Sequence, residues 1–204
     1  MSPIVGLIIS YVAGSIPSAY IAGRLRGVDL RKHGSGNLGA TNVVRVLGAK
    51  TGAVVFVADL AKGFLPVFFL PRYTETLRPG MWAIVFGVAA IIGHVKPIFL
   101  LWKGGGKGVA TASGVFLALA PIPMLVAEAV WIIAFYFTRY VSLASLLGAA
   151  VLPIAILAWY RNPRSAVFIL SVLIAVFVFW THRANIGRLR RGQEHRFVKK
   201  EMAG

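Results

Sequence analysis

Long stretches without charged side chains restrict most strongly what this chain can fold into. A helix needs about 20 mostly apolar residues to cross the hydrocarbon core of a bilayer. Backbone polar groups in lipid must be satisfied within the protein, so such spans are predicted to be helices. The clearest candidate spans are 1–23, 52–71, 80–101, 141–160 and 165–182.

The stretch 108–138 carries a single charge, Glu128, yet it is too long for one crossing. At about 1.5 Å per residue it would measure about 46 Å, against a core of about 30 Å. The segment Pro121–Pro123 disrupts a helix, because proline removes a backbone donor and crowds the preceding turn. The stretch therefore divides into a short span, 107–120, and another, 122–138.

The distribution of basic residues decides between six and seven spans. Lys and Arg of short loops tend to stay on the cytoplasmic side of a membrane. Seven spans place 17 Lys and Arg on one side and four on the other, whereas merging 107–138 into one span gives 11 against 10. We therefore predict an all-α integral membrane bundle of about seven transmembrane helices. It forms a single domain over 1–204, with the N-terminus outside and the C-terminus in the cytoplasm.

The composition excludes several other classes of protein. Of the 204 residues, 58% are hydrophobic and 14% charged, and the net charge is +16. A soluble domain has about a quarter charged residues, and a nucleic-acid binder needs its basic residues on a water-soluble face. Here the basic residues lie between apolar runs, so no nucleic-acid partner is expected. The absence of cysteine excludes disulfides, and no set of metal-ligating residues is apparent, so no metal is expected.

Glycine, hydroxyl and amide residues concentrate in the first predicted cytoplasmic loop, 24–50. Glycines let backbone N–H groups turn toward an oxyanion, and Ser, Asn and Thr side chains add donors. An arginine adds positive charge. The pattern favours a cradle for a phosphate group over a flexible loop with helix-capping side chains. The candidate residues are Gly34, Ser35, Gly36, Asn37, Thr41, Asn42 and Arg45.

The same loop also fits a dinucleotide-binding pattern by spacing alone. Residues 34–39 read G-x-G-x-x-G, and Asp59 lies 20 residues beyond Gly39. That fingerprint requires a strand before the glycines and a helix after them. A predicted membrane helix precedes these glycines, so we reject dinucleotide binding.

In the second polar segment, two lysines flank three glycines just before the span 107–120. Free N–H groups, the positive end of a helix dipole and two ammonium groups would converge there, which predicts a second anion site. It is not a Walker A loop, because Leu101 replaces the first glycine and no Ser or Thr follows Lys107. The alternative, a basic loop touching lipid headgroups, does not need glycines. The candidate residues are Lys103, Gly104, Gly105, Gly106 and Lys107.

The third polar segment follows the last span. If that helix continues, His182, Asn185 and Leu189 fall on one stripe, because they are spaced by three and seven residues. A histidine and an asparagine could then face the first two loops, which lie on the same predicted side. A lone histidine here would more often be an interfacial residue. His182 becomes a candidate site residue because three donor-rich segments meet on the same predicted side.

A few polar residues interrupt the predicted spans. Asp59 and Lys62 are three residues apart on one helical face and are predicted to form an ion pair in the bundle interior, because lone charges in hydrocarbon are costly. Glu128 could face the same interior, but the sequence assigns it no role. Ser142 and Ser145 could cap their helix or extend the site, and we favour capping.

Taken together, the three polar segments closely resemble those of the bacterial acyl-phosphate:glycerol-3-phosphate acyltransferases. The residues that carry the resemblance are 34–42, 103–111, and 182–186 with Gly192, Gln193 and Glu194. The resemblance implies a seven-helix enzyme of the bacterial inner membrane with its active site on the cytoplasmic side. Such an enzyme transfers a fatty acyl group from acyl phosphate to the 1-hydroxyl of glycerol 3-phosphate, which yields lysophosphatidic acid and phosphate and begins phospholipid synthesis. One departure is the third glycine between Lys103 and Lys107, where the family usually has two.

The resemblance also implies roles for individual residues. The first segment would form the hole for the acyl-phosphate group, with Arg45 adding charge. The second would bind glycerol 3-phosphate together with residues of the third. The residues implied for glycerol 3-phosphate are Lys103, Gly104, Gly105, Gly106, Lys107, His182, Asn185 and Glu194. Those implied for catalysis are Ser35, Arg45, Lys107, His182 and Asn185.

An acyl phosphate is already activated, so direct attack by the glycerol hydroxyl is sufficient and no cofactor is expected. We favour Ser35 as a hydrogen-bond donor over Ser35 as a nucleophile, because no base is assigned to it. The partners are then acyl phosphate, glycerol 3-phosphate and membrane lipids. One alternative is a membrane transporter for an organic phosphate, although transport sites tend to lie near the bilayer midplane. Another is a lipid-binding scaffold, which would not need glycines beside its basic residues.

The charge distribution predicts that 24–50, 96–107 and 183–204 are cytoplasmic, and that 72–79 and 161–164 are external. The chain has no cysteine, so single cysteines can be probed without background. In intact cells, an impermeant thiol reagent should label Thr76→Cys and leave Arg190→Cys unlabelled until the membrane is opened. Labelling of Arg190→Cys from outside would contradict the seven-span topology.

Overall fold

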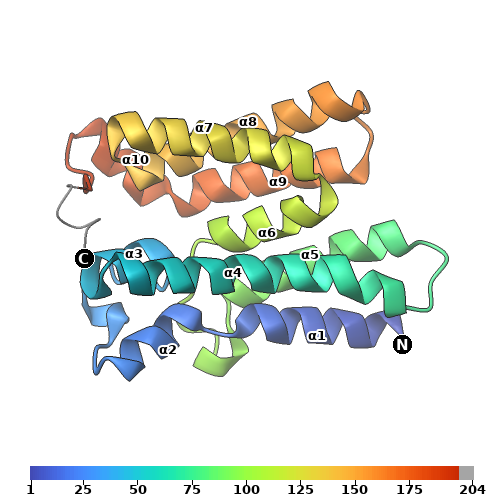
Figure 1. Ribbon diagram of the computed structural model, residues 1–204, viewed down its shortest axis with the longest axis horizontal. Helices are drawn as coiled ribbons and strands as arrows, with labels where there is room; N and C mark the ends of the chain where they lie inside the picture. Colours follow the sequence, from blue (N-terminus) through green and yellow to red (C-terminus); the bar gives the residue numbers. More distant parts are fainter. Residues whose placement is uncertain (198–204) are drawn as a thin grey trace. The chain divides into compact units, whose positions relative to one another are not determined.

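The computed structural model describes residues 1–197, and the regular structure in that range is entirely helical (Figure 1). This confirms the predicted all-α class, and the orientation of the termini stays a prediction. Short 3₁₀ turns at Leu30–Lys32, Leu70–Tyr73 and Ile98–Leu100 join some of the helices. The helices are α1 (Pro3–Ser15), α2 (Ser18–Leu25), α3 (Ala40–Leu47), α4 (Ala49–Phe69), α5 (Pro79–Val95), α6 (Val109–Leu119), α7 (Pro121–Thr138), α8 (Val141–Tyr160), α9 (Ala166–Thr181) and α10 (Arg183–Arg190).

Within residues 1–197, five segments are long and apolar enough to cross a membrane, and a sixth is added if the bent pair α9 and α10 is one span. Each of the seven predicted spans coincides with a helix or a pair of helices. The shortest, α6, has 11 residues, or about 16 Å, and is too short to span a core of about 30 Å. That α6 takes part in a seventh crossing stays a prediction.

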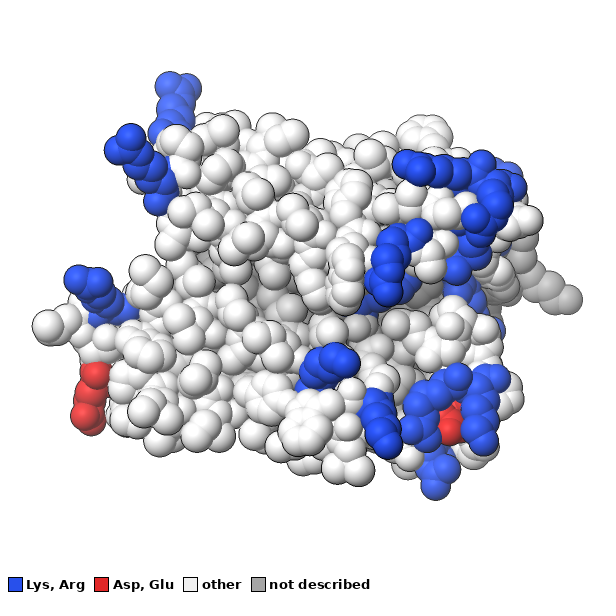
Figure 2. Space-filling model, turned by 180° about the vertical axis from the view of Figure 1, so that it is seen from behind, with Lys and Arg blue, Asp and Glu red and all other residues white. Residues whose placement is uncertain are grey.

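The described residues form two compact units, 1–119 and 120–197, and each is described by itself. Most Lys and Arg residues lie in loops or near the ends of helices. Figure 2 shows them in groups beside a broad surface of other residues. This is the pattern of helices that face lipid along their length and water at their ends. The predicted single domain stays a prediction, and the part 198–204 of the predicted cytoplasmic tail lies outside the described residues.

In the first unit, α1 packs against α5, and α4 packs against both α5 and α6. Glycines allow the backbones to approach closely at these contacts. A Cβ atom on Gly63 would lie 2.1 Å from the Thr111 carbonyl oxygen, and one on Gly114 would lie 2.0 Å from that of Leu60. Small residues serve the same purpose in membrane proteins generally, because packing rather than the hydrophobic effect holds helices together in lipid.

The first predicted span, 1–23, is interrupted at residues 16 and 17. Helix α1 ends at Ser15 and α2 begins at Ser18, because Pro17 cannot donate the backbone hydrogen bond that a continuous helix needs. The exposed backbone at the break is used by a charged residue of α4, since Lys62 Nζ donates to the Ile16 carbonyl oxygen at 2.9 Å. The predicted ion pair is confirmed, with 2.8 Å between Lys62 Nζ and Asp59 Oδ1.

In the second unit, α8 packs against α7 and α9, and α10 follows α9 after a bend of 59°. The bend falls at His182, so the last helix does not continue straight as one stripe would require. Asn185 is buried like His182, whereas Leu189 is only partly buried. The side chain of Glu128 is also partly buried, and its role stays unassigned.

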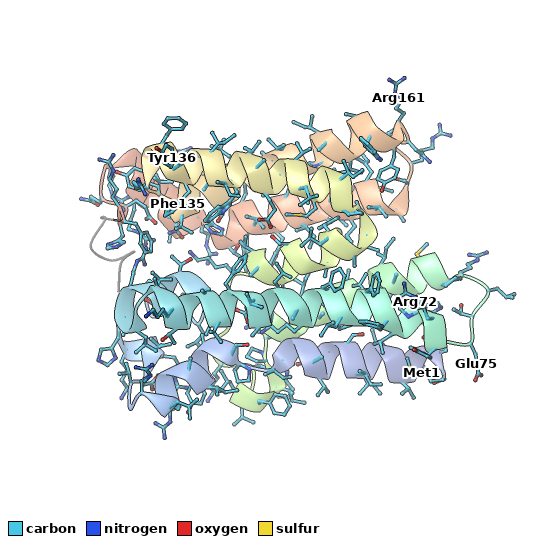
Figure 3. The ribbon with its side chains drawn as sticks, viewed as in Figure 1. Met1, Arg72, Glu75, Phe135, Tyr136 and Arg161 are labelled. Atoms are coloured by element: carbon cyan, nitrogen blue, oxygen red, sulfur yellow. The ribbon has the colours of Figure 1, made fainter. Side chains whose placement is uncertain are left out.

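The two predicted external loops coincide with turns of the structure. The first unit ties its loop to the chain start, where the Met1 ammonium donates to the Tyr73 carbonyl oxygen at 2.7 Å and lies 3.4 Å from Glu75 Oε1 (Figure 3). Arg72 lies at the same end, with its guanidinium 4.0 Å from the centre of the Phe68 ring. In the second unit, Arg161 marks the turn between α8 and α9.

The close contact between α4 and α6 predicts that Gly114→Ala destabilises the protein. The added methyl group meets backbone atoms of α4, which cannot move aside independently, so a loss of about 1–3 kcal/mol is expected. Gly80→Ala is the matched control, because a Cβ atom at Gly80 meets nothing within 4 Å. Thermal unfolding of the detergent-purified variants measures the difference. Equal unfolding temperatures for the two variants would contradict the packing argument.

Candidate active site

The buried side chain of Asn42, on α3, fixes the shape of the first polar loop. Its Oδ1 atom accepts a hydrogen bond from the Ser35 backbone N–H at 2.8 Å. Its Nδ2 atom donates to the carbonyl oxygens of Leu30 at 3.2 Å and His33 at 3.0 Å. Asn42 is 1% exposed, so both ends of its amide are engaged within the loop. This loop-shaping role was not foreseen from the sequence.

Two glycines of this loop adopt backbone conformations that other residues avoid. Gly34 and Gly36 have φ angles of 62° and 70°. A Cβ atom on Gly34 would also lie 2.2 Å from Asn42 Oδ1. Glycine is therefore required at position 34 by the turn and by the asparagine beside it.

Several donors of the first loop are left over after the loop has folded. The hydroxyl group of Ser35 is exposed, and Thr41 lies on the first turn of α3. Within the part of the chain that the structure describes, the backbone N–H groups of Asn37 and Gly39 have no protein acceptor. Arg45 lies one turn after Thr41 on the same short helix, so hydroxyl, amide and guanidinium donors share one small region.

The start of the loop is held by a separate ion pair. Arg31 donates from its backbone N–H and its guanidinium to the Asp29 carboxylate, with side-chain contacts of 2.9 and 2.8 Å. The hydrogen bond from the Arg31 side chain lowers the pKa of Asp29 to about 2. The Arg31 guanidinium also lies 5.1 Å from the centre of the Tyr20 ring on α2, which ties the loop to that helix.

The second polar loop leaves α5 through a strained turn. Leu101 and Trp102 both have positive φ angles, 51° and 59°, which cost free energy for residues other than glycine. A hydrogen bond fixes the turn, because Trp102 Nε1 donates to the Tyr11 hydroxyl at 2.8 Å. Tyr11 in turn donates to the Lys96 carbonyl oxygen at 2.9 Å. The exposed Lys103 then begins the glycine segment.

Gly105 and Gly106 pack directly against the end of α5. A Cβ atom on Gly105 would lie 2.3 Å from the Val95 carbonyl oxygen, and one on Gly106 would lie 2.0 Å from Nε2 of His94. The Gly106 N–H donates to the His94 carbonyl oxygen at 3.3 Å. These glycines are therefore needed for packing as well as for any anion that approaches. Among the described residues, the N–H groups of Gly104 and Gly105 have no protein acceptor.

The structure brings the first two polar loops together. Asn37 Nδ2 donates to the Gly105 carbonyl oxygen at 3.2 Å, which joins segments 68 residues apart. Leu38 of the first loop and Gly104 of the second also line one small open pocket. The sequence predicts that these loops share a side of the membrane, and the structure shows in addition that they are in direct contact.

Three ionisable side chains that no sequence pattern links to the loops line the same pocket. They are Asp59 and Lys62 of α4 and His94 of α5, and all three are buried. The Nδ1 atom of His94 lies 3.7 Å from Asp59 Oδ1. A signal was present in the sequence, because His94 stands at the end of an apolar span just before the basic, glycine-rich segment.

The third polar segment belongs to the second unit and is organised by Glu194. Its Oε1 atom accepts hydrogen bonds from Asn185 Nδ2 at 2.7 Å and from the Ser142 hydroxyl at 3.0 Å. Its Oε2 atom accepts from Arg188 Nε at 2.7 Å. Ser142 therefore extends this cluster, and the favoured capping role was wrong. Ser145 does not cap α8 either, since it accepts from Trp131 Nε1 at 3.2 Å.

Burial of Glu194 would raise the pKa of its carboxyl group, but its three donors outweigh that effect. Hydrogen bonds from Asn185, Arg188 and Ser142 together hold the pKa below the ordinary value of a glutamate. His182 is buried nearby on the chain, with Nδ1 2.8 Å from the Val178 carbonyl oxygen, so Nδ1 carries the proton of that contact. That this segment meets the first two loops stays a prediction.

Apolar helices of spanning length, with polar residues gathered in a few loops, define a multi-span integral membrane protein whose candidate active site lies in those loops. Comparison with known proteins gives the particular group within this class. The chain belongs to the glycerol-3-phosphate acyltransferase family, which it matches over residues 4–192.

Curated relatives and solved structures agree with this assignment. A glycerol-3-phosphate acyltransferase of Fusobacterium nucleatum is 43% identical, over 94% of this chain and 96% of its own length. One of Aquifex aeolicus is 42% identical, over 94% and 97%. A crystal structure of the integral membrane glycerol 3-phosphate acyltransferase PlsY, in its glycerol 3-phosphate form, has a TM-score of 0.87 at 38% identity. It covers 98% of this chain and 97% of its own. The lysophosphatidic acid form has a TM-score of 0.84 at 37% identity, with the same coverage.

The charged state of Glu194 predicts a pH-dependent contribution to stability. Because folding lowers the pKa of this group, its contribution is fully present above about pH 4.3, the ordinary value, and is lost as the pH falls through the lower folded value. Glu194→Gln should therefore unfold at a lower temperature than the wild type at pH 7, by a loss of about 2 kcal/mol. The difference in unfolding temperature between the wild type and Glu194→Gln should become smaller below about pH 4.3.

The exposed Glu75 provides the control for this measurement. Glu75→Gln should leave the unfolding temperature unchanged both at pH 7 and below about pH 4.3, because exposed ion pairs contribute little to stability. A gap between wild type and Glu194→Gln that stays constant down to pH 3 would show that the charge of Glu194 does not matter.

Proposed function

We propose that this protein transfers a fatty acyl group from acyl phosphate to the 1-hydroxyl of glycerol 3-phosphate. The products are lysophosphatidic acid and inorganic phosphate. The observation that carries the proposal is the hydrogen bond from Asn37 to Gly105, which joins a loop rich in oxyanion donors to a loop rich in glycine and lysine. Two adjacent anion sites suit a reaction in which both substrates carry a phosphate group. The family assignment supports the acceptor, because the relatives are named for glycerol 3-phosphate.

In this proposal the first loop holds the donor. Ser35, Asn37 and Thr41 supply hydrogen bonds to the phosphate of acyl phosphate, and Arg45 neutralises its charge. Gly34 and Gly36 allow the turn, and Asn42 fixes it. Ser35 acts as a donor and not as a nucleophile, because no described side chain lies within hydrogen-bond distance of its hydroxyl to serve as a base.

The second and third segments hold the acceptor. Lys103, Lys107 and the N–H groups of the glycine segment bind the phosphate of glycerol 3-phosphate. The third segment completes the site with His182 and Asn185, and Glu194 orients Asn185 through its 2.7 Å hydrogen bond.

The chemistry is a single displacement at the acyl carbon. The 1-hydroxyl oxygen attacks that carbon, the bond to the phosphate oxygen breaks, and phosphate leaves with the electron pair. The hydroxyl proton passes to His182 or to a phosphate oxygen. Arg45, Lys107 and backbone N–H groups stabilise the charge that develops on the leaving phosphate. Holding the substrates in register supplies much of the rate, since effective molarities reach about 10⁵ M.

The proposal places this enzyme in the bacterial inner membrane with the site facing the cytoplasm. The charge distribution supports this orientation, because the polar loops fall on the side with 17 Lys and Arg. Glycerol 3-phosphate then arrives from the water, and the acyl chain of the donor lies between helices or in lipid.

The experiment supplies purified protein in detergent with labelled glycerol 3-phosphate and acyl phosphate. Lysophosphatidic acid and phosphate should form in equal amounts, and an acyl thioester of coenzyme A should be a poor donor. Arg45→Ala should lower kcat by about 10²-fold, the scale for loss of a strong electrostatic donor. Gly80→Ala should behave as wild type. Equal turnover with the thioester would contradict the donor assignment, and uptake of glycerol 3-phosphate into vesicles without any product would favour a transporter.

A further inference from the structure

A chain of buried polar contacts runs from the break in the first span to the glycine segment of the second loop. Lys62 Nζ contacts the Ile16 carbonyl oxygen at 2.9 Å and Asp59 Oδ1 at 2.8 Å. The same Asp59 oxygen lies 3.7 Å from His94 Nδ1. None of these side chains has a role in the acyl transfer described above.

The ring of His94 lies directly beneath the glycine segment. Its Nε2 atom is the nearest neighbour of the position that a Cβ atom on Gly106 would take, at 2.0 Å. The two other close atoms, at 2.6 and 3.1 Å, belong to the same ring. The His94 carbonyl oxygen also accepts the Gly106 N–H. His94 therefore contacts this glycine through both its backbone and its side chain.

The other end of the His94 ring faces Asp59 and has little freedom. His94 is 6% exposed, and its Nδ1 atom makes no hydrogen bond within residues 1–197. An N–H group on Nδ1 would be attracted to this carboxylate more strongly than in water, because the pair is buried. Asp59 is itself paired with Lys62 at 2.8 Å, so the His94 ring packs beside a buried ion pair.

We propose that His94 is a positioning residue for the acceptor site. Packed beside Asp59, its ring sets the place of the backbone at Gly105 and Gly106, and so of the Gly104 and Gly105 N–H groups that bind the phosphate of glycerol 3-phosphate. The inference rests on the proposed function of the glycine segment. The His94 ring, which belongs to α5 and not to the loop, would thus support the glycine segment from inside the helix bundle.

The test uses the different surroundings of two neighbouring glycines. The three heavy atoms nearest to a methyl group on Gly106 all belong to the His94 ring, whereas a methyl group on Gly105 meets the backbone oxygens of His94 and Val95. Gly106→Ala should raise KM for glycerol 3-phosphate about tenfold, the lower end of the usual overpacking effect. Removing the ring with His94→Ala removes that clash. The double variant should then have the same KM as His94→Ala alone, within about twofold.

Gly105→Ala is the matched control, because shortening His94 cannot move the backbone oxygens that it meets. The effect of Gly105→Ala on KM for glycerol 3-phosphate should be the same with and without His94→Ala. His94→Ala alone should raise KM for glycerol 3-phosphate severalfold, with kcat and KM for acyl phosphate nearly unchanged. The positioning role is overturned if the two substitutions raise KM for glycerol 3-phosphate independently, so that their effects multiply in the double variant. It is also overturned if His94→Ala changes kcat and KM for acyl phosphate as much as KM for glycerol 3-phosphate.

Amide hydrogen exchange over residues 103–108 tests the proposal apart from activity. His94→Ala should speed exchange in this segment and leave α7 and α8 unchanged, and the same exchange rate as wild type would overturn it. If wild type makes no lysophosphatidic acid but the exchange changes as expected, the proposed function fails while the positioning role stands. Should His94→Ala fail to fold, His94→Gln takes its place, because a flexible side chain end can yield to the methyl group of Gly106→Ala.

Discussion

A carboxylate inside an apolar helix must be compensated, and the first unit is arranged around the compensation of Asp59. Removing a charge from water costs several kcal/mol unless the charge is paired and hydrogen-bonded. Lys62 supplies the opposite charge, and its ammonium group also donates a hydrogen bond to the Ile16 carbonyl oxygen at the break after α1. His94 of α5 approaches the same carboxylate. Three helices are thereby tied to one buried charge pair close to the polar loops.

Amide side chains hold the polar loops together, as the buried charge pair holds the helices together. Asn42 satisfies three backbone groups of the first loop, and Asn37 bonds to the backbone of the second. Asparagine suits these positions because one side chain both donates and accepts hydrogen bonds. The loops can therefore keep irregular backbone without leaving polar groups unsatisfied, and their remaining N–H groups stay available for anions.

The sequence contained the spans, the charged pair and the polar loops, because hydrophobic length and local spacing specify such features. It did not reveal the bend at His182 or the link from Ser142 to Glu194, which joins residues 52 positions apart. Contacts of that kind depend on how helices pack, and no local pattern encodes them. The Pro17 break lies between these cases. The proline was visible, but its use by Lys62 could only be seen once α1 and α4 were placed together.

The shortness of α6 has a consequence for where two dissimilar molecules can meet. If α6 enters the bilayer as predicted, one of its ends lies at hydrocarbon depth, because a helix of 11 residues cannot reach from one membrane surface to the other. Irregular backbone is tolerated at that depth only where protein surrounds it or water enters. A recess of that kind would be reached from lipid on one side and from water on the other, so an apolar reactant and a highly polar one could meet there.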